Sequence, residues 1–128
     1  MRILVDTHTF IWAVSDPKRL SHKAKVLLED PDNDAVLSVA SIWEMAIKTS
    51  LGRLTIASSL ADLLRDQISH RQFSVLSISA EHAIGVVSLP MYHTDPFDRL
   101  LVSQCKIEQI PLVSRDSELD AYGIERAW

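Results

Sequence analysis

The sequence predicts an α/β fold in which helices surround a central, mainly parallel sheet of four to five short strands. Two observations support this fold class. Short apolar runs rich in β-branched residues alternate along the chain with segments whose apolar residues recur at helical spacing, which is typical of βαβ units. The strand candidates are also largely apolar throughout, as strands covered on both faces should be.

Four of these runs are the expected strands, and a weaker fifth lies near the end of the chain. The four cover residues 3–5, 35–38, 74–76 and 112–113, and the fifth is an edge strand near Ile124. Serines mark the starts of three helices between them, because a serine hydroxyl accepts hydrogen bonds from the N–H groups of a first turn. They are Ser21, Ser59, which forms a capping-box variant with Asp62, and Ser79, whose helix is expected to turn Ala83, Val86 and Val87 to one side.

Length and composition predict one globular domain over residues 1–128. The chain is 47% hydrophobic, enough for a buried core, and its single cysteine, Cys105, excludes an internal disulfide. It opens on a strand-like run instead of a signal peptide, so we expect a cytoplasmic protein. No apolar stretch approaches the roughly 20 residues of a membrane span. The net charge of −4 disfavours a broadly basic nucleic-acid binder, unless several acids gather at one cation site.

Carboxylates recur where the expected strands end. Asp6 directly follows the first strand, and Asp116 follows the 112–113 strand after two residues. Ligands of open parallel sheets collect at this edge. Glu44 lies on the polar stripe of an otherwise apolar helix after the second strand, and Asp95 and Asp98 lie in or just before the first turn of a later helix.

Such a cluster needs a compensating proton or cation, because two carboxylates about 5 Å apart repel by about 3 kcal/mol at an effective dielectric constant near 20. Mg²⁺ and Mn²⁺ prefer oxygen ligands and suit two to four carboxylates, whereas zinc fits poorly. A metal held in this way can activate water and neutralise the charge that develops on a phosphodiester. The acids therefore predict metal-dependent phosphodiester hydrolysis, with one ion or two.

Each acid has a structural alternative. Asp6 could cap the helix that begins near His8, Asp95 could be the N-cap of a helix with Pro96 in its first position, and Asp116 or Ser114 could cap the last short helix. Glu44 could pair with Lys48 four residues later. The histidines, His93 included, are expected to be structural or exposed, and Trp12, Trp43 and Trp128 to be packing residues.

Taken together, the motifs resemble PIN-domain ribonucleases of the VapC toxin type in order and spacing. The likeness rests on Ile3-Leu4-Val5-Asp6-Thr7-His8, on residues 38–48 around Trp43-Glu44, on His93-Thr94-Asp95-Pro96-Phe97-Asp98-Arg99-Leu100-Leu101, and on Ser114-Arg115-Asp116. It runs across nearly the whole chain. Any single piece is a modest motif, but the four in this order are specific.

The resemblance implies a three-layer αβα fold and an endoribonuclease that needs Mg²⁺ or Mn²⁺. It also implies a homodimer and a tight complex with a small antitoxin whose tail covers the acidic pocket. Carried over by position, the acidic quartet is Asp6, Glu44, Asp98 and Asp116, with Asp95 as an additional acid. We expect Asp6 and Asp98 to be the main metal ligands, Asp116 to complete the ligand set, and Glu44 to act through water or on a second ion.

The basic residues nearest to these acids in sequence are Arg99, Arg115 and Lys48, and we expect them to contact RNA phosphates. Each could instead be an ion-pair partner of the acids. Three rival functions are a phosphoacceptor receiver domain, a catalytically silent PIN-like binding module and a structure-specific DNA nuclease. The receiver fits badly, because Thr7 follows Asp6 where a second acid is needed and no lysine follows the last strand.

Overall fold

A computed structural model describes residues 1–128 and contains one five-stranded sheet in which every pair of neighbouring strands is parallel. The strands are β1 (Arg2–Val5), β2 (Asp34–Ser38), β3 (Ser74–Leu76), β4 (Leu112–Val113) and β5 (Arg126–Ala127), and their spatial order is β3-β2-β1-β4-β5. The α/β class and the four main strands are confirmed. The sheet is wholly parallel, whereas the sequence predicted a mainly parallel one.

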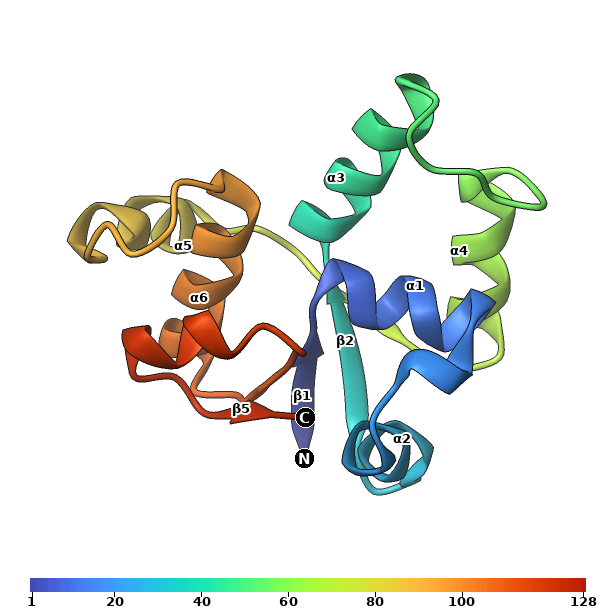
Figure 1. Ribbon diagram of the computed structural model, residues 1–128, viewed down its shortest axis with the longest axis horizontal. Helices are drawn as coiled ribbons and strands as arrows, with labels where there is room; N and C mark the ends of the chain where they lie inside the picture. Colours follow the sequence, from blue (N-terminus) through green and yellow to red (C-terminus); the bar gives the residue numbers. More distant parts are fainter.

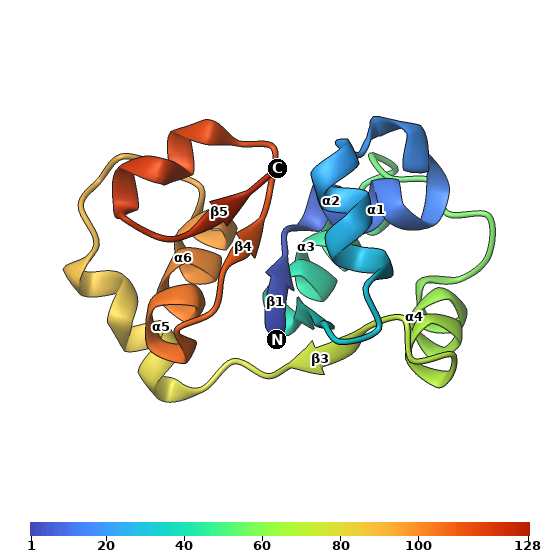
Figure 2. The same cartoon turned by 90° about the horizontal axis from the view of Figure 1, so that it is seen from below.

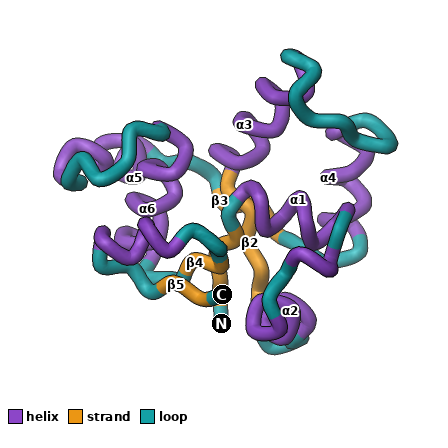
Figure 3. The backbone as a smooth tube through the Cα atoms, viewed as in Figure 1, coloured by secondary structure: helices purple, strands orange, loops and turns teal.

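The helices lie on both sides of this sheet (Figures 1 and 3), which gives the expected three layers. They are α1 (Thr7–Ser15), α2 (His22–Glu29), α3 (Val39–Ser50), α4 (Leu60–Ser69), α5 (Ala80–Gly85) and α6 (Pro96–Glu108), with 3₁₀ helices η1 (Pro17–Arg19), η2 (Val86–Ser88) and η3 (Ser117–Tyr122). Figure 2 shows β1 between α1 and α2 on one side and α6 on the other. None of these helices combines the length and apolar character needed to cross a membrane.

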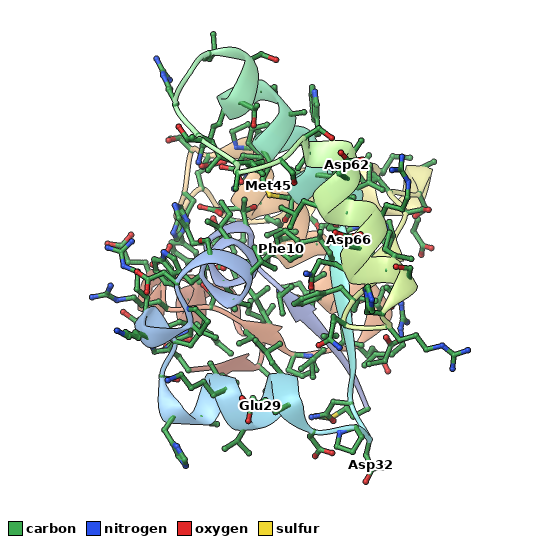
Figure 4. All side chains as sticks on the ribbon, turned by 90° about the vertical axis from the view of Figure 1, so that its right-hand side faces the viewer. Phe10, Glu29, Asp32, Met45, Asp62 and Asp66 are labelled. Carbon is green, nitrogen blue, oxygen red and sulfur yellow. The ribbon has the colours of Figure 1, made fainter.

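Two apolar cores fill the spaces between the layers, because successive residues of each strand point to opposite faces. Ile3 and Val5 of β1 join the core under α1, α2 and α4, whereas Leu4 between them joins the core under α6 and η3. Figure 4 shows Phe10 of α1 and Met45 of α3, both fully buried, beside α4, whose Asp62 and Asp66 are exposed. Both faces of the central strands are therefore covered, which is why their inner residues are apolar, whereas Val75 of the edge strand β3 is 41% exposed.

The serine-capped helices begin where the sequence predicts. Ser21, Ser59 and Ser79 each accept a hydrogen bond from the backbone N–H three residues later. The helix after Ser79 is shorter than expected, because the chain tightens into η2 at Val86 and Pro90 follows soon after. Val87 is consequently 86% exposed, and the expected apolar face is wrong at this residue.

The last strand lies two residues after the position predicted for it near Ile124. Gly123 adopts a left-handed conformation (φ 74°) that ends η3, and the chain straightens only at Arg126. The Arg126 guanidinium donates to both Asp120 carboxylate oxygens and to the Ser114 carbonyl oxygen. These bonds hold the short edge strand against β4 and tie it to the loop that follows β4.

Candidate active site

The strand order places a topological switch point between β1 and β4. The chain continues from β1 to β2 on one side of the sheet and reaches β4 and β5 on the other. Ligands of open α/β sheets bind outside the carboxyl ends of the strands at such a point. The Asp6 N–H donates to the Val113 carbonyl oxygen at 3.2 Å and the Thr9 hydroxyl donates to it at 3.0 Å, so the two strand ends are joined.

An open pocket of about 510 Å³ lies at this point. Acidic side chains dominate its lining, and the one apolar residue is Trp12. The lining residues are Asp6, His8, Trp12, Asp95, Asp98, Arg115, Asp116, Ser117 and Glu118. The structure thus brings together four of the five acids singled out in the sequence, and it adds Glu118.

Asp6 both caps a helix and lines the pocket. The structural alternative is therefore observed, and it is compatible with a role in the pocket. Its Oδ1 accepts a hydrogen bond from the Thr9 N–H at 2.7 Å, which makes it the N-cap of α1. Its Oδ2 accepts a hydrogen bond from the Ser114 hydroxyl. The same hydroxyl oxygen accepts from the Asp116 N–H at 3.1 Å, so one serine orients the segments that carry both acids.

Asp95 and Asp116 are also N-caps. Asp95 Oδ1 accepts from the N–H groups of Phe97 and Asp98 at the start of α6, and Asp116 Oδ1 accepts from the Glu118 N–H at the start of η3. The backbone donors and the positive end of a helix stabilise a negative charge at such positions. The structural alternatives for both acids are therefore real, and they are compatible with a place in the pocket.

Asp98 differs from the capping acids because its side chain takes part in no hydrogen bond or ion pair. Partial burial and the negative charges of Asp95, Glu44, Asp6 and Asp116 raise the pKa of its carboxyl group to about 7. Burial is the largest cause. A carboxyl group with a pKa shifted this far, in a cleft, is a candidate for a functional role.

Glu44 takes no part in lining the pocket. It is buried on α3, and Lys48 pairs with it at 3.0 Å, so the structural alternative for this pair is the observed one. Its charge nevertheless acts on Asp98. Lys48, which was predicted to contact phosphate, forms this ion pair with Glu44 instead.

Arg99 is buried, unlike an exposed phosphate contact. Its guanidinium donates to the carbonyl oxygens of Val86, Leu89 and Pro90, and the residue is only 8% exposed. It fixes the turn after η2, and this arrangement gives the predicted phosphate contact no support. Arg115 is exposed and lines the pocket, so it is the one predicted basic contact that the structure leaves open to a ligand.

The sequence analysis predicted His93 to be structural or exposed and did not place it at the site. Its Nε2 lies 3.4 Å from Asp116 Oδ2 and 3.7 Å from Glu118 Oε2. Donor atoms of His93, Asp98 and Asp116 all lie within 4.8 Å of one another. The signal was the position of His93 two residues before Asp95, in the same segment as the acids. An oxygen-only site gave no reason to use it.

The donor set fits a divalent cation. The carboxylates of Asp6, Asp98 and Asp116 line one pocket, and donor atoms of Asp98, Asp116 and His93 lie within 4.8 Å of one another. Asp98 has no cationic partner, and the imidazole nitrogens of His93 are buried without a hydrogen-bond partner. A bound cation would offset the burial and the repulsion that raise the pKa of Asp98. With an open side and a basic residue at its rim, such a site suits an anionic substrate.

Comparisons with known proteins agree with this fold. The family model described as PIN domain matches residues 3–125. The chain is similar to Ribonuclease VapC22 of Mycobacterium tuberculosis, with 28% identity over 121 residues that cover 94% of this chain and 91% of the relative.

Two solved complexes contain a chain with the same fold. One is the DNA-bound VapBC of Salmonella typhimurium, with a TM-score of 0.73 and 15% identity over 99% of this chain and 97% of that one. The other is VapBC2 of Rickettsia felis bound to a promoter DNA fragment, with a TM-score of 0.72 and 14% identity over 100% and 99% of the two chains. Because the PIN domain match spans nearly all of the sequence, the chain belongs to the PIN domain family.

Proposed function

We propose that this protein is an endoribonuclease that hydrolyses RNA phosphodiester bonds with a Mg²⁺ or Mn²⁺ ion bound at its acidic pocket. The observation that carries the proposal is the convergence of Asp6, Asp98 and Asp116 at the switch point of the sheet. Family membership and the similarity to a ribonuclease favour this chemistry over the other uses of an acidic pocket.

In this proposal the acids divide the work. Asp6 and Asp98 are the main metal ligands, and Asp116 completes the ligand set. Glu44 acts indirectly, because its negative charge raises the pKa of the Asp98 carboxyl group. A divalent ion bound there supplies an activated water and neutralises charge on the phosphate. Ser114 holds the Asp6 carboxylate in place, so that its orientation is fixed before the ion binds.

The remaining lining residues would bind the RNA. Arg115 is exposed at the rim and would contact a phosphate, which positions the backbone without reading sequence. Trp12 and His8 lie beside each other at the same rim, with ring centroids 5.7 Å apart. Unpaired bases stack on such rings, so a single-stranded stretch of RNA would suit this edge.

The first test is cleavage of a mixed pool of small RNAs with Mg²⁺ or Mn²⁺, with EDTA as a control. Asp6→Asn is preferable to alanine, because asparagine keeps the N-cap acceptor of α1 while it removes the charge. Asp98→Asn tests the second ligand. Asp66→Asn is the matched control, since this exposed acid lies on the outer side of α4 away from the pocket (Figure 4).

Metal-dependent cutting that is lost in Asp6→Asn and Asp98→Asn but kept in Asp66→Asn would support the proposal. Cutting that continues in EDTA would contradict the role of the metal. If no RNA is cut with either ion, the fold acts as a binding module. Cleavage of structured DNA in a parallel reaction would instead identify a DNA nuclease.

We further propose that the protein is the toxin of a toxin–antitoxin pair, is located in the cytoplasm and forms a homodimer. The solved complexes of similar fold, named VapBC, support an antitoxin partner for this chain. Exposed apolar side chains between α5 and α6, among them Val87 and Met91, support a contact between this part of the surface and another protein chain. Light scattering of the purified chain tests the dimer, and copurification with the product of an adjacent gene tests the antitoxin.

A further inference from the structure

We propose that His93 is a nitrogen ligand of the bound metal ion and that, with Asp98 and Asp116, it makes a mixed imidazole–carboxylate site that favours a first-row transition ion over Mg²⁺. The inference rests on the metal site of the proposed function and adds a ligand and an ion preference to it. Its three donors come from the loop before α6, from the first turn of α6 and from the loop after β4.

The first observation is that the imidazole is buried without a partner. The His93 side chain is 10% exposed, and neither Nδ1 nor Nε2 makes a hydrogen bond. A buried polar group without a partner destabilises the fold, and such groups in folded proteins call for an explanation. A metal ligand is one, because the ion would occupy the nitrogen lone pair that has no donor.

The second observation is where the ring points. Nε2 lies 3.4 Å from Asp116 Oδ2 and 3.7 Å from Glu118 Oε2, so it faces the acids of the pocket. A direct N–H···O hydrogen bond would bring these atoms to about 2.7–3.2 Å. One donor atom from each of His93, Asp98 and Asp116 lies within 4.8 Å of the other two, a spacing that a shared ion can serve with a small contraction.

The third observation is that the imidazole is anchored by the core. The backbone N–H of His93 donates to the Tyr122 hydroxyl oxygen at 2.9 Å, and the centroids of the two rings lie 5.5 Å apart. Tyr122 is itself buried, 4% exposed, in the core under α6. The backbone that carries the imidazole is therefore fixed before any ion binds, as a preorganised ligand requires.

A nitrogen donor changes which ion the pocket prefers. Mg²⁺ binds oxygen ligands and keeps several waters, whereas imidazole is a ligand for first-row transition ions. With His93 in the set, we expect Mn²⁺ to bind more tightly than Mg²⁺ by about tenfold, since only the transition ion gains from the nitrogen. Without the imidazole, the remaining ligands are all oxygens and the preference should largely disappear.

The test uses Mn²⁺ itself as the probe, with binding and spectroscopy as readouts in place of cleavage. The electron paramagnetic resonance signal gives the concentration of free Mn²⁺ during the titration. Electron spin echo envelope modulation detects a ¹⁴N nucleus bound directly to the ion. Mg²⁺ affinity is obtained by competition. The variants are His93→Gln, Asp98→Asn and, as the matched control, His8→Gln, which alters the histidine that lines the pocket.

The expected result is a bound-nitrogen signal in the natural protein and in His8→Gln that is absent in His93→Gln. His93→Gln should also lose about tenfold or more of the Mn²⁺ affinity while Mg²⁺ affinity changes less than about threefold. Mn²⁺ binding with no bound-nitrogen signal would overturn the inference and leave the proposed function standing. Equal losses for both ions would overturn it too, because they indicate a positioning role. No Mn²⁺ binding by the natural protein would overturn both.

Discussion

Replacing Asp98 by asparagine should stabilise the metal-free protein, although it removes a proposed metal ligand. Burial and four neighbouring acids raise the pKa of this carboxyl group from 3.8 to about 7. One pKa unit corresponds to about 1.4 kcal/mol, so the Asp98 carboxyl destabilises the folded protein at neutral pH by at most about 4 kcal/mol. The carboxyl is partly exposed and solvent screens its neighbours, which reduces the expected gain to about 2 kcal/mol.

The stability gained by Asp98→Asn over the natural protein must increase as the pH rises. Below about pH 4 the carboxyl is protonated in both the folded and the unfolded chain, and asparagine offers no advantage. Between about pH 4 and pH 7 the unfolded chain loses this proton while the folded chain keeps it, so the natural protein loses stability as the pH rises. The difference between variant and natural protein should therefore grow over this window and stay constant above it.

Thermal unfolding in EDTA across this pH range measures the effect, and a gain of about 2 kcal/mol corresponds to about 5–10 °C in Tm. Asp120→Asn is a control of opposite sign. The Arg126 guanidinium lowers the pKa of the Asp120 carboxyl, so its stabilising contribution is present above the pKa of the unfolded chain and is lost as the pH falls. If Asp98→Asn is no more stable than the natural protein at pH 8, or equally stabilised at pH 4, the reasoning is refuted.

Three further predictions follow from single contacts. Ser114→Ala removes the hydroxyl shared by Asp6 and Asp116 and should lower the free energy of unfolding by about 1–3 kcal/mol and Mn²⁺ affinity by about tenfold. Urea denaturation and Mn²⁺ titration measure these changes. Arg99→Lys puts a single nitrogen where two guanidinium nitrogens reach three carbonyl oxygens, and it should cost about 2–4 kcal/mol in urea denaturation. Unchanged stability with weaker RNA binding would instead support the phosphate contact. Arg115→Ala should leave stability within about 0.5 kcal/mol and reduce the salt dependence of RNA affinity by one phosphate contact, measured by fluorescence anisotropy in an Asp98→Asn background.

Much of the fold could be predicted because it follows from local chemistry. The four main strands are apolar on both faces, and three serines begin helices by satisfying backbone N–H groups. The fifth strand was misplaced because a strand of two residues carries no periodic signal. Its position depends on the left-handed turn at Gly123 and on the bonds of Arg126, which join residues far from the strand's own pattern.

The acids of the pocket could be predicted because each follows a strand or opens a helix, and parallel strands bring such positions to one edge. The contacts that the Arg99 and His93 side chains make could not be predicted. Arg99 follows an acid directly, but its guanidinium turns to carbonyl oxygens 9 to 13 residues earlier. His93 reaches Asp116 from a loop that is held by Tyr122. Both outcomes depend on how loops pack against the core, which spacing along the sequence does not encode.

The pocket also shows how one site can serve both folding and metal binding. Asp6, Asp95 and Asp116 each cap a helix, so backbone N–H groups stabilise their charges whether or not an ion is bound. Asp98 has no such donors, and burial together with the charges of the neighbouring acids disfavours its ionised form. Binding of an ion would relieve this repulsion and contribute to the stability of the fold.

The order of stabilities should consequently reverse when metal is added. An ion at about 100 times its Kd stabilises the natural protein by about 2.7 kcal/mol. That gain exceeds the advantage of Asp98→Asn, which lacks the ligand and should gain much less. Asp98→Asn should therefore unfold at a higher temperature than the natural protein in EDTA and at a lower temperature in excess Mn²⁺. Parallel stabilisation of both proteins by Mn²⁺ would mean that the ion binds elsewhere.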